Sequence, residues 1–365
     1  MKVHLTPALR LLSCYMVFIP FSGLVAQPPA HVQNSSNSKK GLFESEDILT
    51  ITLSGKLREV LNSRVGTPKS LPLNLSYYKE DSSEVIIPVN VKTRGHFRRM
   101  RENCVYPPLL IEFSKDKDQL SSIFSEQRKL KLVMPCQEDK YLIREWLVYK
   151  IYNLVTPKSF RARLVKVKLD DDRKKKESTP FYGILLEEEK QMAKRNKEVI
   201  VERKLLPQQT APDAFINMAF FQYLIGNTDW SVPYQHNIKL LARDSVTIPF
   251  TVPYDFDHAG IVDAPYAYPA EELQMKSVRD RRFRGYCIQN MKEYEEVVAL
   301  YNRLKNDIYN LYTHCELLEE RYIKSTTAYL DEFYKTINNP KALEREFTYP
   351  CNNKNGNVVI KGLQE

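Results

Sequence analysis

Hydrophobic and polar residues alternate along most of the first half of the chain, and this period of two is typical of half-buried β-strands. Polar turn segments separate the alternating runs, and the turn at residues 79–83 predicts a hairpin. Because consecutive runs are joined in this way, we expect a mostly antiparallel sheet. The predicted strands cover residues 49–53, 71–78, 85–92, 109–113, 129–133, 161–169 and 180–186.

The apolar period changes to that of a helix at residues 141–155, and Pro157 ends this predicted helix. Beyond residue 190 the pattern is mainly helical. One helix opens at Ala211, and two more cover residues 291–318 and 318–337. The chain therefore predicts an α+β protein with two lobes, a β-rich N-terminal lobe at residues 45–190 and a helical C-terminal lobe at residues 191–350.

Both ends of the chain differ from its body. Residues 1–26 combine a basic start with an apolar stretch and a plausible cleavage site, which is the pattern of a secretory signal peptide. An uncleaved anchor is the alternative, but the apolar run is shorter than the roughly 20 residues that a membrane span needs. Residues 27–44 read as a flexible tether and residues 351–365 as a polar tail. We expect an exported protein, periplasmic, cell-surface or extracellular, without a stable membrane span.

Composition narrows the function only slightly. The 365 residues carry a formal net charge of +9, which suits an acidic or phosphate-bearing ligand but fits a solvated basic surface equally well. The sequence has no zinc-finger spacing and no aromatic RNA-binding motif, so we expect no nucleic-acid partner.

Six cysteines are present, of which Cys14 lies in the predicted signal peptide. Export permits disulfides, and the odd number that remains leaves at least one thiol without a partner in the same chain. Bridges between lobes would restrain their motion, so we expect pairing within a lobe; five buried free thiols are the alternative. The expected bridge is Cys104–Cys136, with at most one pair among Cys287, Cys315 and Cys351.

The densest group of chemically useful residues lies between residues 225 and 260. The segment reads I-G-N-T-D-W-S-V-P-Y-Q-H-N-I-K-L-L and, after a short connection, T-V-P-Y-D-F-D-H-A-G. Asp229, Asn237, Asp255 and Asp257 supply oxygen atoms on either side of a predicted β-hairpin whose strands are at 237–241 and 246–253. Because a hairpin returns the chain to its starting edge, we expect Asn237 and Asp255 to lie close together.

Kinases use this layout, and the two motifs resemble the CotH family of spore-coat and secreted kinases. More distantly they resemble the HipA-like and phosphatidylinositol kinases. The segments V-K-T-R-G-H-F-R-R, K-L-K-L-V, L-I-R-E-W-L-V-Y and F-Y-G-I-L-L-E-E-E agree, so the match spans roughly residues 70–270. Two features depart from the common kinase pattern: the interval from Asp229 to Asn237 is longer, and D-F-D stands in place of D-F-G.

The resemblance implies a bilobal protein-kinase-like fold and phosphoryl transfer from ATP to a protein or small-molecule hydroxyl, with Mg²⁺ (or Mn²⁺) as the metal. Asp229 would position the acceptor hydroxyl. Asn237, Asp255 and Asp257 are the candidate metal ligands. Each also has a structural explanation, since Asp and Asn commonly stabilise turns. His236 is expected to be structural, because no second histidine is near enough to suggest zinc.

A glycine-rich loop cannot bind the phosphates here, because Gly95 is the only glycine between residues 90 and 140. Other groups have to bind them. Arg98 and Arg99 follow it and are expected to help through their side chains. Lys129 competes with Lys131 for the role of the kinase lysine, and ordinary surface charge is the alternative for all of these residues. The candidate nucleotide-binding residues are Arg94, Gly95, Lys131, Arg144, Glu145, Glu187 and Glu189.

Two other functions remain open. The same fold can bind a nucleotide without turnover, as a pseudokinase, or transfer the nucleotidyl group, and the missing glycine loop motivates both. Alternatively the chain is a non-enzymatic envelope protein whose tether presents an interaction domain.

Overall fold

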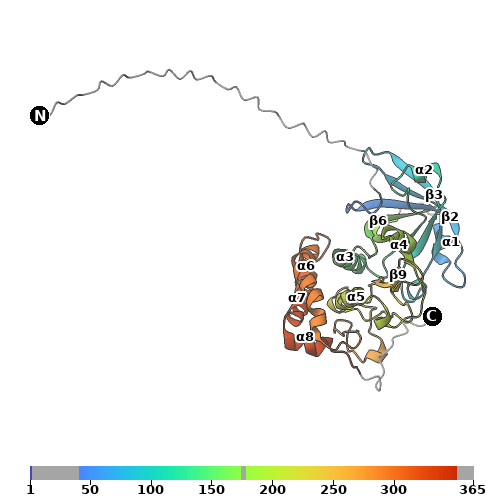
Figure 1. The fold of residues 1–365 in the computed structure, drawn as a ribbon. Helices are drawn as coiled ribbons and strands as arrows, with labels where there is room; N and C mark the ends of the chain where they lie inside the picture. Colours follow the sequence, from blue (N-terminus) through green and yellow to red (C-terminus); the bar gives the residue numbers. More distant parts are fainter. Residues whose placement is uncertain (2–40, 174–177, 352–365) are drawn as a thin grey trace. The chain divides into compact units, whose positions relative to one another are not determined.

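The computed structural model describes Met1 and residues 41–173 and 178–351 (Figure 1). The predicted signal peptide beyond Met1, most of the predicted tether and all but the first residue of the predicted tail lie outside the described residues. Among the helices that are described, none is both long enough and apolar enough to cross a bilayer.

The N-terminal strands form a closed barrel, which corrects the simple sheet that the alternation predicts. The order around the barrel is β1-β2-β3-β4-β5-β7-β6, and the parallel pairing of β1 with β6 closes it. The remaining neighbours are antiparallel, as expected. Closure removes the two exposed sheet edges, which would otherwise present unpaired backbone groups. The strands are β1 (Leu49–Gly55), β2 (Leu71–Tyr78), β3 (Glu84–Thr93), β4 (Leu109–Phe113), β5 (Lys129–Val133), β6 (Ala162–Asp171) and β7 (Phe181–Leu186).

The interior of the barrel is apolar because alternate residues of every strand point inward. Ile51, Leu75, Ile87 and Leu130 are fully buried there. On β5 the same alternation turns Lys131 to the opposite side from its neighbours Leu130 and Leu132. Three short helical segments belong to this lobe, α1 (Leu57–Asn62), η1 (Phe97–Arg99) and α2 (Lys117–Leu120).

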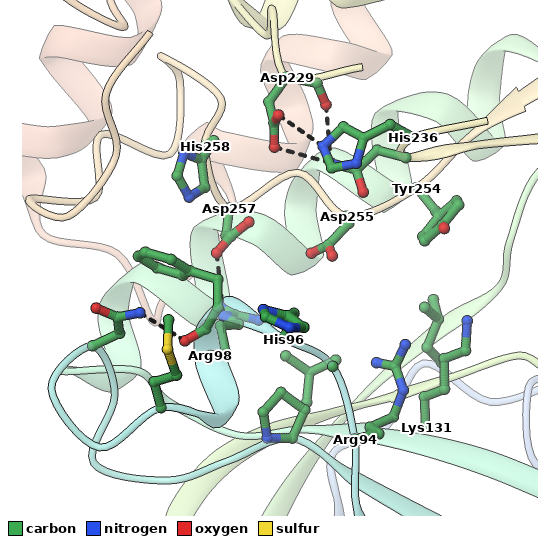
Figure 2. Close-up of a pocket in the computed structure, with 18 of the residues that line it drawn as sticks. Arg94, His96, Arg98, Lys131, Asp229, His236, Tyr254, Asp255, Asp257 and His258 are labelled. Carbon is green, nitrogen blue, oxygen red and sulfur yellow. Dashed lines mark hydrogen bonds and ion pairs between the residues drawn. The ribbon is translucent and has the colours of Figure 1, made fainter. Parts of the chain in front are cut away.

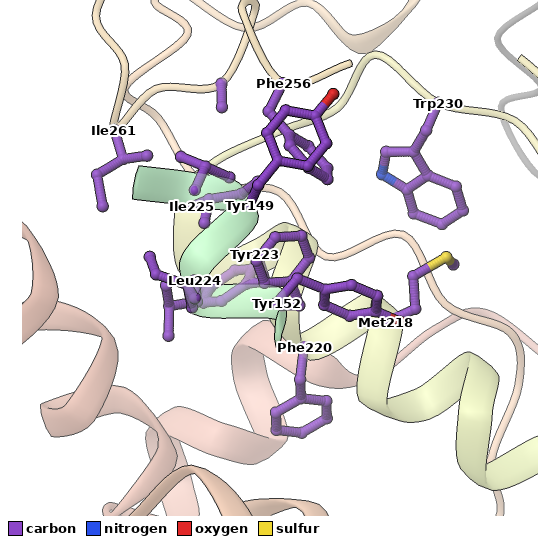
Figure 3. Close-up of a cluster of buried hydrophobic side chains, with 14 of the residues drawn as sticks. Tyr149, Tyr152, Met218, Phe220, Tyr223, Leu224, Ile225, Trp230, Phe256 and Ile261 are labelled. Carbon is purple, nitrogen blue, oxygen red and sulfur yellow. The ribbon is translucent and has the colours of Figure 1, made fainter. Parts of the chain in front are cut away.

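A second hydrophobic core joins the barrel to the C-terminal helices through α3 (Asp139–Val155), which lies between them (Figure 1). This helix is buried on most of its surface, because it packs against β6 and β7 on one side and against α5 (Pro212–Ile225) and α6 (Glu295–Thr313) on the other. Figure 3 shows Tyr149 and Tyr152 of α3 among side chains of α5 and of the segment around Phe256. The lobes therefore share one packed core next to the candidate site.

The rest of the C-terminal lobe surrounds a three-stranded sheet of order β10-β9-β8. The predicted helices in this lobe are confirmed, with residues 291–294 forming a 3₁₀ turn before α6. Its remaining elements are α4 (Glu189–Arg195), β8 (Val199–Ile200), η2 (Pro207–Gln209), β9 (Ile238–Ala242), β10 (Phe250–Pro253), η3 (Glu271–Leu273), η4 (Met291–Tyr294), α7 (Glu320–Ile337) and α8 (Pro340–Phe347).

The described part of the chain contains two disulfides, each within a single lobe. Cys104–Cys136 is the bridge expected from the sequence, and its Cα atoms are 4.2 Å apart. Cys287–Cys351 joins the segment before η4 to the end of the described chain, with Cα atoms 4.8 Å apart. Cys315 is the free cysteine among the described residues, so the alternative of five free thiols is wrong.

Candidate active site

The hairpin of β9 and β10 brings the two motifs of the predicted site together, as predicted. The strands are antiparallel with Ile238 opposite Pro253, and the backbone N–H of Tyr254 donates to the carbonyl of Asn237 at 3.0 Å. The second strand begins at Phe250, four residues later than predicted, because residues 244–247 form a turn held by the Asp244 carboxylate. Asn237 and Asp255 consequently flank the same end of the hairpin.

Asn237 and Asp255 both adopt the left-handed backbone conformation, with φ of 51° and 64°. This region is costly for most residues, although Asn and Asp tolerate it better than others. Phe256, which follows Asp255, is fully buried and packs against Tyr149 and Phe221 with ring centroids 4.8 and 5.4 Å apart. Buried packing of this kind holds the strained backbone in place, and such strain is concentrated at functional sites.

Asp229 is positioned by the end of α5. The helix stops at Gly226, which has φ of 67°, and a Cβ there would lie 2.1 Å from the hydroxyl oxygen of Tyr329. Only glycine fits both the conformation and this close approach. The next residue, Asn227, accepts a hydrogen bond from the backbone N–H of Asp229 through its side chain, at 3.0 Å. Arg284 donates to the carbonyls of the residues on either side of Asp229, which fixes the loop.

The carboxylate of Asp229 is held by the two residues that precede β9. His236 Nε2 lies 2.8 Å from one oxygen, and Asn237 Nδ2 donates to the other at 3.0 Å. Burial would raise the pKa of Asp229, but the hydrogen bond and positive charge of His236, with smaller contributions from His258 and Arg284, lower it below its ordinary value. Asp229 is therefore ionised at neutral pH.

Asp257 and Asp255 have different surroundings. The Asp257 carboxylate forms an ion pair with Arg98 Nε at 3.2 Å. Asp255 uses its backbone N–H to donate to the Tyr149 hydroxyl, and within the described part of the chain no hydrogen bond or ion pair reaches its carboxylate oxygens. Burial, together with the negative charge of Asp257, raises the pKa of Asp255 against the opposing effect of the nearby arginines.

The donor set around Asp255 fits a metal ion that arrives with phosphate groups. Over residues 41–173 and 178–351, no cluster of three or more His, Cys, Asp or Glu side chains offers a complete cage. Mg²⁺, however, is commonly held by one or two carboxylates with phosphates and water. Because Asn237 donates to Asp229 through its amide nitrogen, its amide oxygen stays available at the end of the hairpin that also carries Asp255. Burial and the negative charge of Asp257 disfavour the ionised form of Asp255, and a bound cation would offset both effects.

These residues line one cavity of about 410 Å³, shown in Figure 2. Lys131 lies in its wall, with Nζ 5.1 Å from the Tyr254 ring centroid. Burial, and then the charge of Arg94, lower the pKa of Lys131 to about 8. Val133 and Leu186 add an apolar surface on the same side. Of the residues singled out from the sequence for binding or catalysis, the cavity brings together Arg94, Gly95, Arg98, Lys131, Asp229, Asn237, Asp255 and Asp257.

Kinases pair a strand lysine with a helix glutamate, and the resemblance therefore implies a pair of Lys131 with Glu145, but Glu145 does not contact Lys131. Its carboxylate lies 3.3 Å from Arg98, so that Arg98 is shared between Glu145 and Asp257. Burial raises the pKa of Glu145 to about 8, against the opposing charge of Arg98. Lys129, the competitor of Lys131, is half exposed and pairs with Glu112 at 2.9 Å. The ion pair that links α3 to the site is therefore Arg98–Glu145, and Arg98 lies in the β3–β4 loop.

Arg144 lies away from the cavity and joins α3 to the C-terminal helices. Its guanidinium donates to the carbonyl of Val262 at 3.1 Å and stacks 3.7 Å from the Tyr322 ring centroid. The helix period could not show which side of α3 faces the cavity, because α3 is buried on both sides.

Glu187 and Glu189 also lie outside the cavity wall. Glu187 is buried, pairs with Arg195 at 2.9 Å and accepts a hydrogen bond from the Arg161 backbone at 3.0 Å. Glu189 pairs with Lys239 at 2.9 Å. Both carboxylates are therefore occupied in fixing the connection between the lobes.

Sequence reasoning missed several residues of the cavity wall. His236, expected to be structural, contacts Asp229 directly, and its position immediately before Asn237 was the available signal. His96, Tyr149, Tyr254 and His258 also line the cavity, and the signal for each was its place within a segment that resembles the kinase motifs.

No protein-family model and no curated protein sequence matches this chain. Among solved structures, it is similar to the crystal structure of a Helicobacter pylori proinflammatory kinase, CtkA, with a TM-score of 0.38 and 13% sequence identity. The similarity covers 69% of this chain and 95% of that chain. Values this low do not establish a common fold.

Proposed function

We propose that this protein is a phosphotransferase with a kinase-like fold, resembling the CotH family, which moves the γ-phosphoryl group of ATP to a hydroxyl of a protein or small molecule. The observation that supports this proposal is the convergence of Asp229, Asn237 and Asp255 on one cavity that also holds Lys131 and Arg94. The five residues come from separate elements of the two lobes and supply the parts that phosphoryl transfer requires.

Asp229 would receive the acceptor hydroxyl. A carboxylate whose pKa is lowered is a weak base, so its main contribution is to accept a hydrogen bond and orient the oxygen toward phosphorus. His236 and Asn237 keep its two oxygens in one orientation. Such positioning is the larger part of catalysis in phosphoryl transfer, where little covalent chemistry falls to the protein.

Arg94 and Lys131 would bind the phosphates in place of a glycine-rich loop. Lys131 is mostly protonated at neutral pH, because its lowered pKa of about 8 still lies above 7. Asn237 and Asp255 would hold Mg²⁺ (or Mn²⁺) together with the phosphate oxygens. When bound, this ion would neutralise the charge that develops between the β- and γ-phosphates.

We also propose that the protein works outside the cytoplasm. The basic and apolar pattern of residues 1–26 supports export. The two disulfides support it as well, because such bridges persist in oxidising compartments.

Incubation of the purified chain with Mg²⁺ and either [γ-³²P]ATP or [α-³²P]ATP tests the proposal. We expect γ-label to move to an acceptor or to be released as phosphate, and Asp255→Ala to abolish this. Transfer of the α-label instead would identify a nucleotidyl transferase. Binding of ATP without movement of either label would identify a pseudokinase. A protein whose thermal unfolding does not respond to ATP and Mg²⁺ would be a non-enzymatic one.

A further inference from the structure

A second cavity, of about 320 Å³, lies on the outer wall of the barrel. Residues of β6, β1, β2 and β3 line it, and these four strands are neighbours in that order. None of the described residues that line it also lines the candidate active site. We call this cavity the barrel pocket, and its size is that of a small-molecule site.

The strand register places polar side chains next to one another in the barrel pocket. Thr52 on β1 lies opposite Ser76 on β2. Ser54, the next outward residue of β1, lies opposite Asn74 on β2 and Asp170 on β6. Directly opposite residues of an antiparallel pair have β-carbons about 5 Å apart, and β6 continues the same face. These five side chains therefore form one continuous polar surface.

Ser76 is the residue that indicates a ligand. It is only 7% exposed, although the alternation with Leu75 and Tyr77, which point into the barrel, places it on the outside. Within the residues that the structure describes, no hydrogen bond reaches its hydroxyl group, and the same is true of the side chains of Thr52 and Asn74. Buried polar groups almost always have a partner. A buried hydroxyl that faces a cavity without a protein partner is therefore suited to bind a group that enters this cavity.

The polar groups of the barrel pocket match a ligand with several hydroxyl groups. The hydroxyls of Thr52, Ser54 and Ser76 and the amide of Asn74 can each both donate and accept a hydrogen bond. A sugar hydroxyl has the same double capacity, so it can reproduce the hydrogen bonds of the water molecule that it replaces. A ligand with only apolar groups would leave all of these side chains unsatisfied.

The barrel pocket also offers an accessible apolar surface. Tyr78 is 62% exposed and Ile86 is 49% exposed, and both line the pocket. The face of an aromatic ring carries partial negative charge. The C–H groups on one face of a pyranose ring carry partial positive charge, so they pack favourably against it. An exposed aromatic ring beside hydroxyl and amide groups is thus a surface that fits a sugar.

Other ligand classes fit the barrel pocket less well. Glu84, which lies opposite Tyr78, and Asp170 contribute two carboxylates, whereas Lys168 contributes one ammonium group. This balance disfavours a phosphate or another polyanion. Each of the four strands pairs with a neighbour on both sides, because the barrel is closed. A peptide therefore cannot bind here by adding a strand to a free sheet edge.

We propose that the barrel pocket is a binding site for a neutral carbohydrate, whose hydroxyl groups bond to Thr52, Ser76 and Asn74 and whose ring packs on Tyr78. The proposal goes beyond the proposed function and does not depend on it, since the two cavities are lined by different residues. A chain that transfers no phosphoryl group could still bind the carbohydrate.

An array of immobilised glycans that includes neutral, anionic and amine-bearing members tests the proposal with the full chain. We expect binding to neutral glycans built from hexoses, and calorimetry with the best-bound neutral oligosaccharide then gives its Kd. Binding that is confined to anionic or amine-bearing glycans would overturn the proposal, because charge would then be the recognised feature. Absence of binding to every glycan would overturn it as well.

Two substitutions test whether the neutral glycan occupies the barrel pocket. We expect Tyr78→Ala to weaken binding about tenfold, because the stacking surface is lost. Thr52→Val should weaken it several-fold, because it removes one hydroxyl but keeps the shape of the side chain and suits a strand. Tyr234→Ala is the matched control, because Tyr234 is 52% exposed and does not line the barrel pocket. Thermal unfolding confirms that each variant is folded, and an unchanged Kd in folded Tyr78→Ala or Thr52→Val would overturn the proposal.

Discussion

Arg98 and Asp257 form a buried ion pair, with Nε 3.2 Å from the carboxylate, and this pair separates the roles of the two aspartates around Phe256. The same guanidinium lies 3.3 Å from Glu145 of α3, so Asp257 is tied to the barrel lobe and to α3 through one cation. No residue described in the structure binds the carboxylate of Asp255 in this way. Asp255 is thus free to bind a cation, whereas Asp257 fixes the geometry around it.

Substitution of the two aspartates is expected to have different consequences. Asp255→Ala should remove the Mg²⁺-dependent part of ATP affinity, because the carboxylate that is free to bind the ion is lost. Asp257→Ala should retain Mg²⁺ dependence and lower stability by about 3 kcal/mol, because a buried ion pair loses one partner. Calorimetric titration with ATP in the presence and absence of Mg²⁺, with thermal unfolding of each variant, measures both effects. Loss of Mg²⁺ dependence only in Asp257→Ala would reverse the assignment.

Asp229→Asn is expected to leave folding intact and to slow transfer by roughly 10²–10⁴-fold. The amide has nearly the shape of the carboxylate but carries no negative charge to hold the acceptor hydroxyl. Asp244→Asn is the matched control, because Asp244 lies in the exposed turn between β9 and β10. Initial rates at saturating ATP, with circular dichroism of both variants, check the prediction. Near wild-type turnover by a folded Asp229→Asn protein would exclude Asp229 from the reaction.

Much of the fold followed from local patterns. The strands and long helices were predictable because burial of one face imposes a period of two or of 3.6 residues. The closing pair of β1 and β6 was not, since parallel pairing between distant strands leaves no mark on either one. The side of α3 that faces the cavity was not predictable either. A helical period shows orientation only where one face is apolar and the other polar, and α3 is buried on both sides.

The candidate site was predictable only where a hairpin fixes the geometry. The turn between β9 and β10 brings Asn237 and Asp255 together, and the order of residues alone implied this. By contrast, the partner of Glu145 could not be read from the sequence, because Lys131, Lys129 and Arg98 all lie on elements near α3. The tertiary packing of the lobe places Arg98, and neither lysine, next to Glu145. Charge alone does not distinguish such alternatives.

The lowered pKa of Lys131 predicts how ATP binding depends on pH. Its value of about 8, caused first by burial and then by Arg94, means that ATP affinity should fall as pH rises through about 8, where the ammonium loses its proton. Lys131→Arg should remove this fall, since an arginine stays charged. Dissociation constants measured from about pH 6.5 to 9.5 check it. A wild-type affinity that is constant across this range would show that Lys131 does not bind the phosphates.

The same shift affects stability with the opposite sign. The folded state binds the Lys131 proton more weakly than the unfolded state, whose lysine has the ordinary pKa of 10.5. Between about pH 8 and 10.5 the unfolded state therefore holds more protons, and the contribution of Lys131 to stability rises with pH. Lys131→Met should be more stable than the wild type near neutral pH while it binds ATP more weakly. Thermal melts of both proteins at two pH values measure the effect, and a destabilised Lys131→Met protein would contradict it.

The Cys104–Cys136 disulfide is expected to maintain ATP affinity as well as stability. The bridge ties the β3–β4 loop, which carries Arg94 and Arg98, to the segment that follows β5. Lys131 lies in β5 itself. Beside the bridge, the Val105 N–H donates to the Cys136 carbonyl at 2.9 Å, and Arg64 donates to the carbonyls of Cys104 and Val105. Loss of the bridge should let the arginines move away from Lys131 and the aspartates.

We therefore expect Cys104→Ser/Cys136→Ser to lose about 2–4 kcal/mol of stability and also to bind ATP more weakly. Cys287→Ser/Cys351→Ser is the matched control, because neither of its cysteines is next to a residue of the cavity wall, whereas Cys104 follows Asn103, which lines the cavity. The control should lose stability but keep its ATP affinity. Thermal unfolding and ATP titration of both double variants, at a temperature where each is folded, separate the two effects. Equal ATP affinity in the two variants would mean that the bridge stabilises the barrel lobe without positioning the arginines.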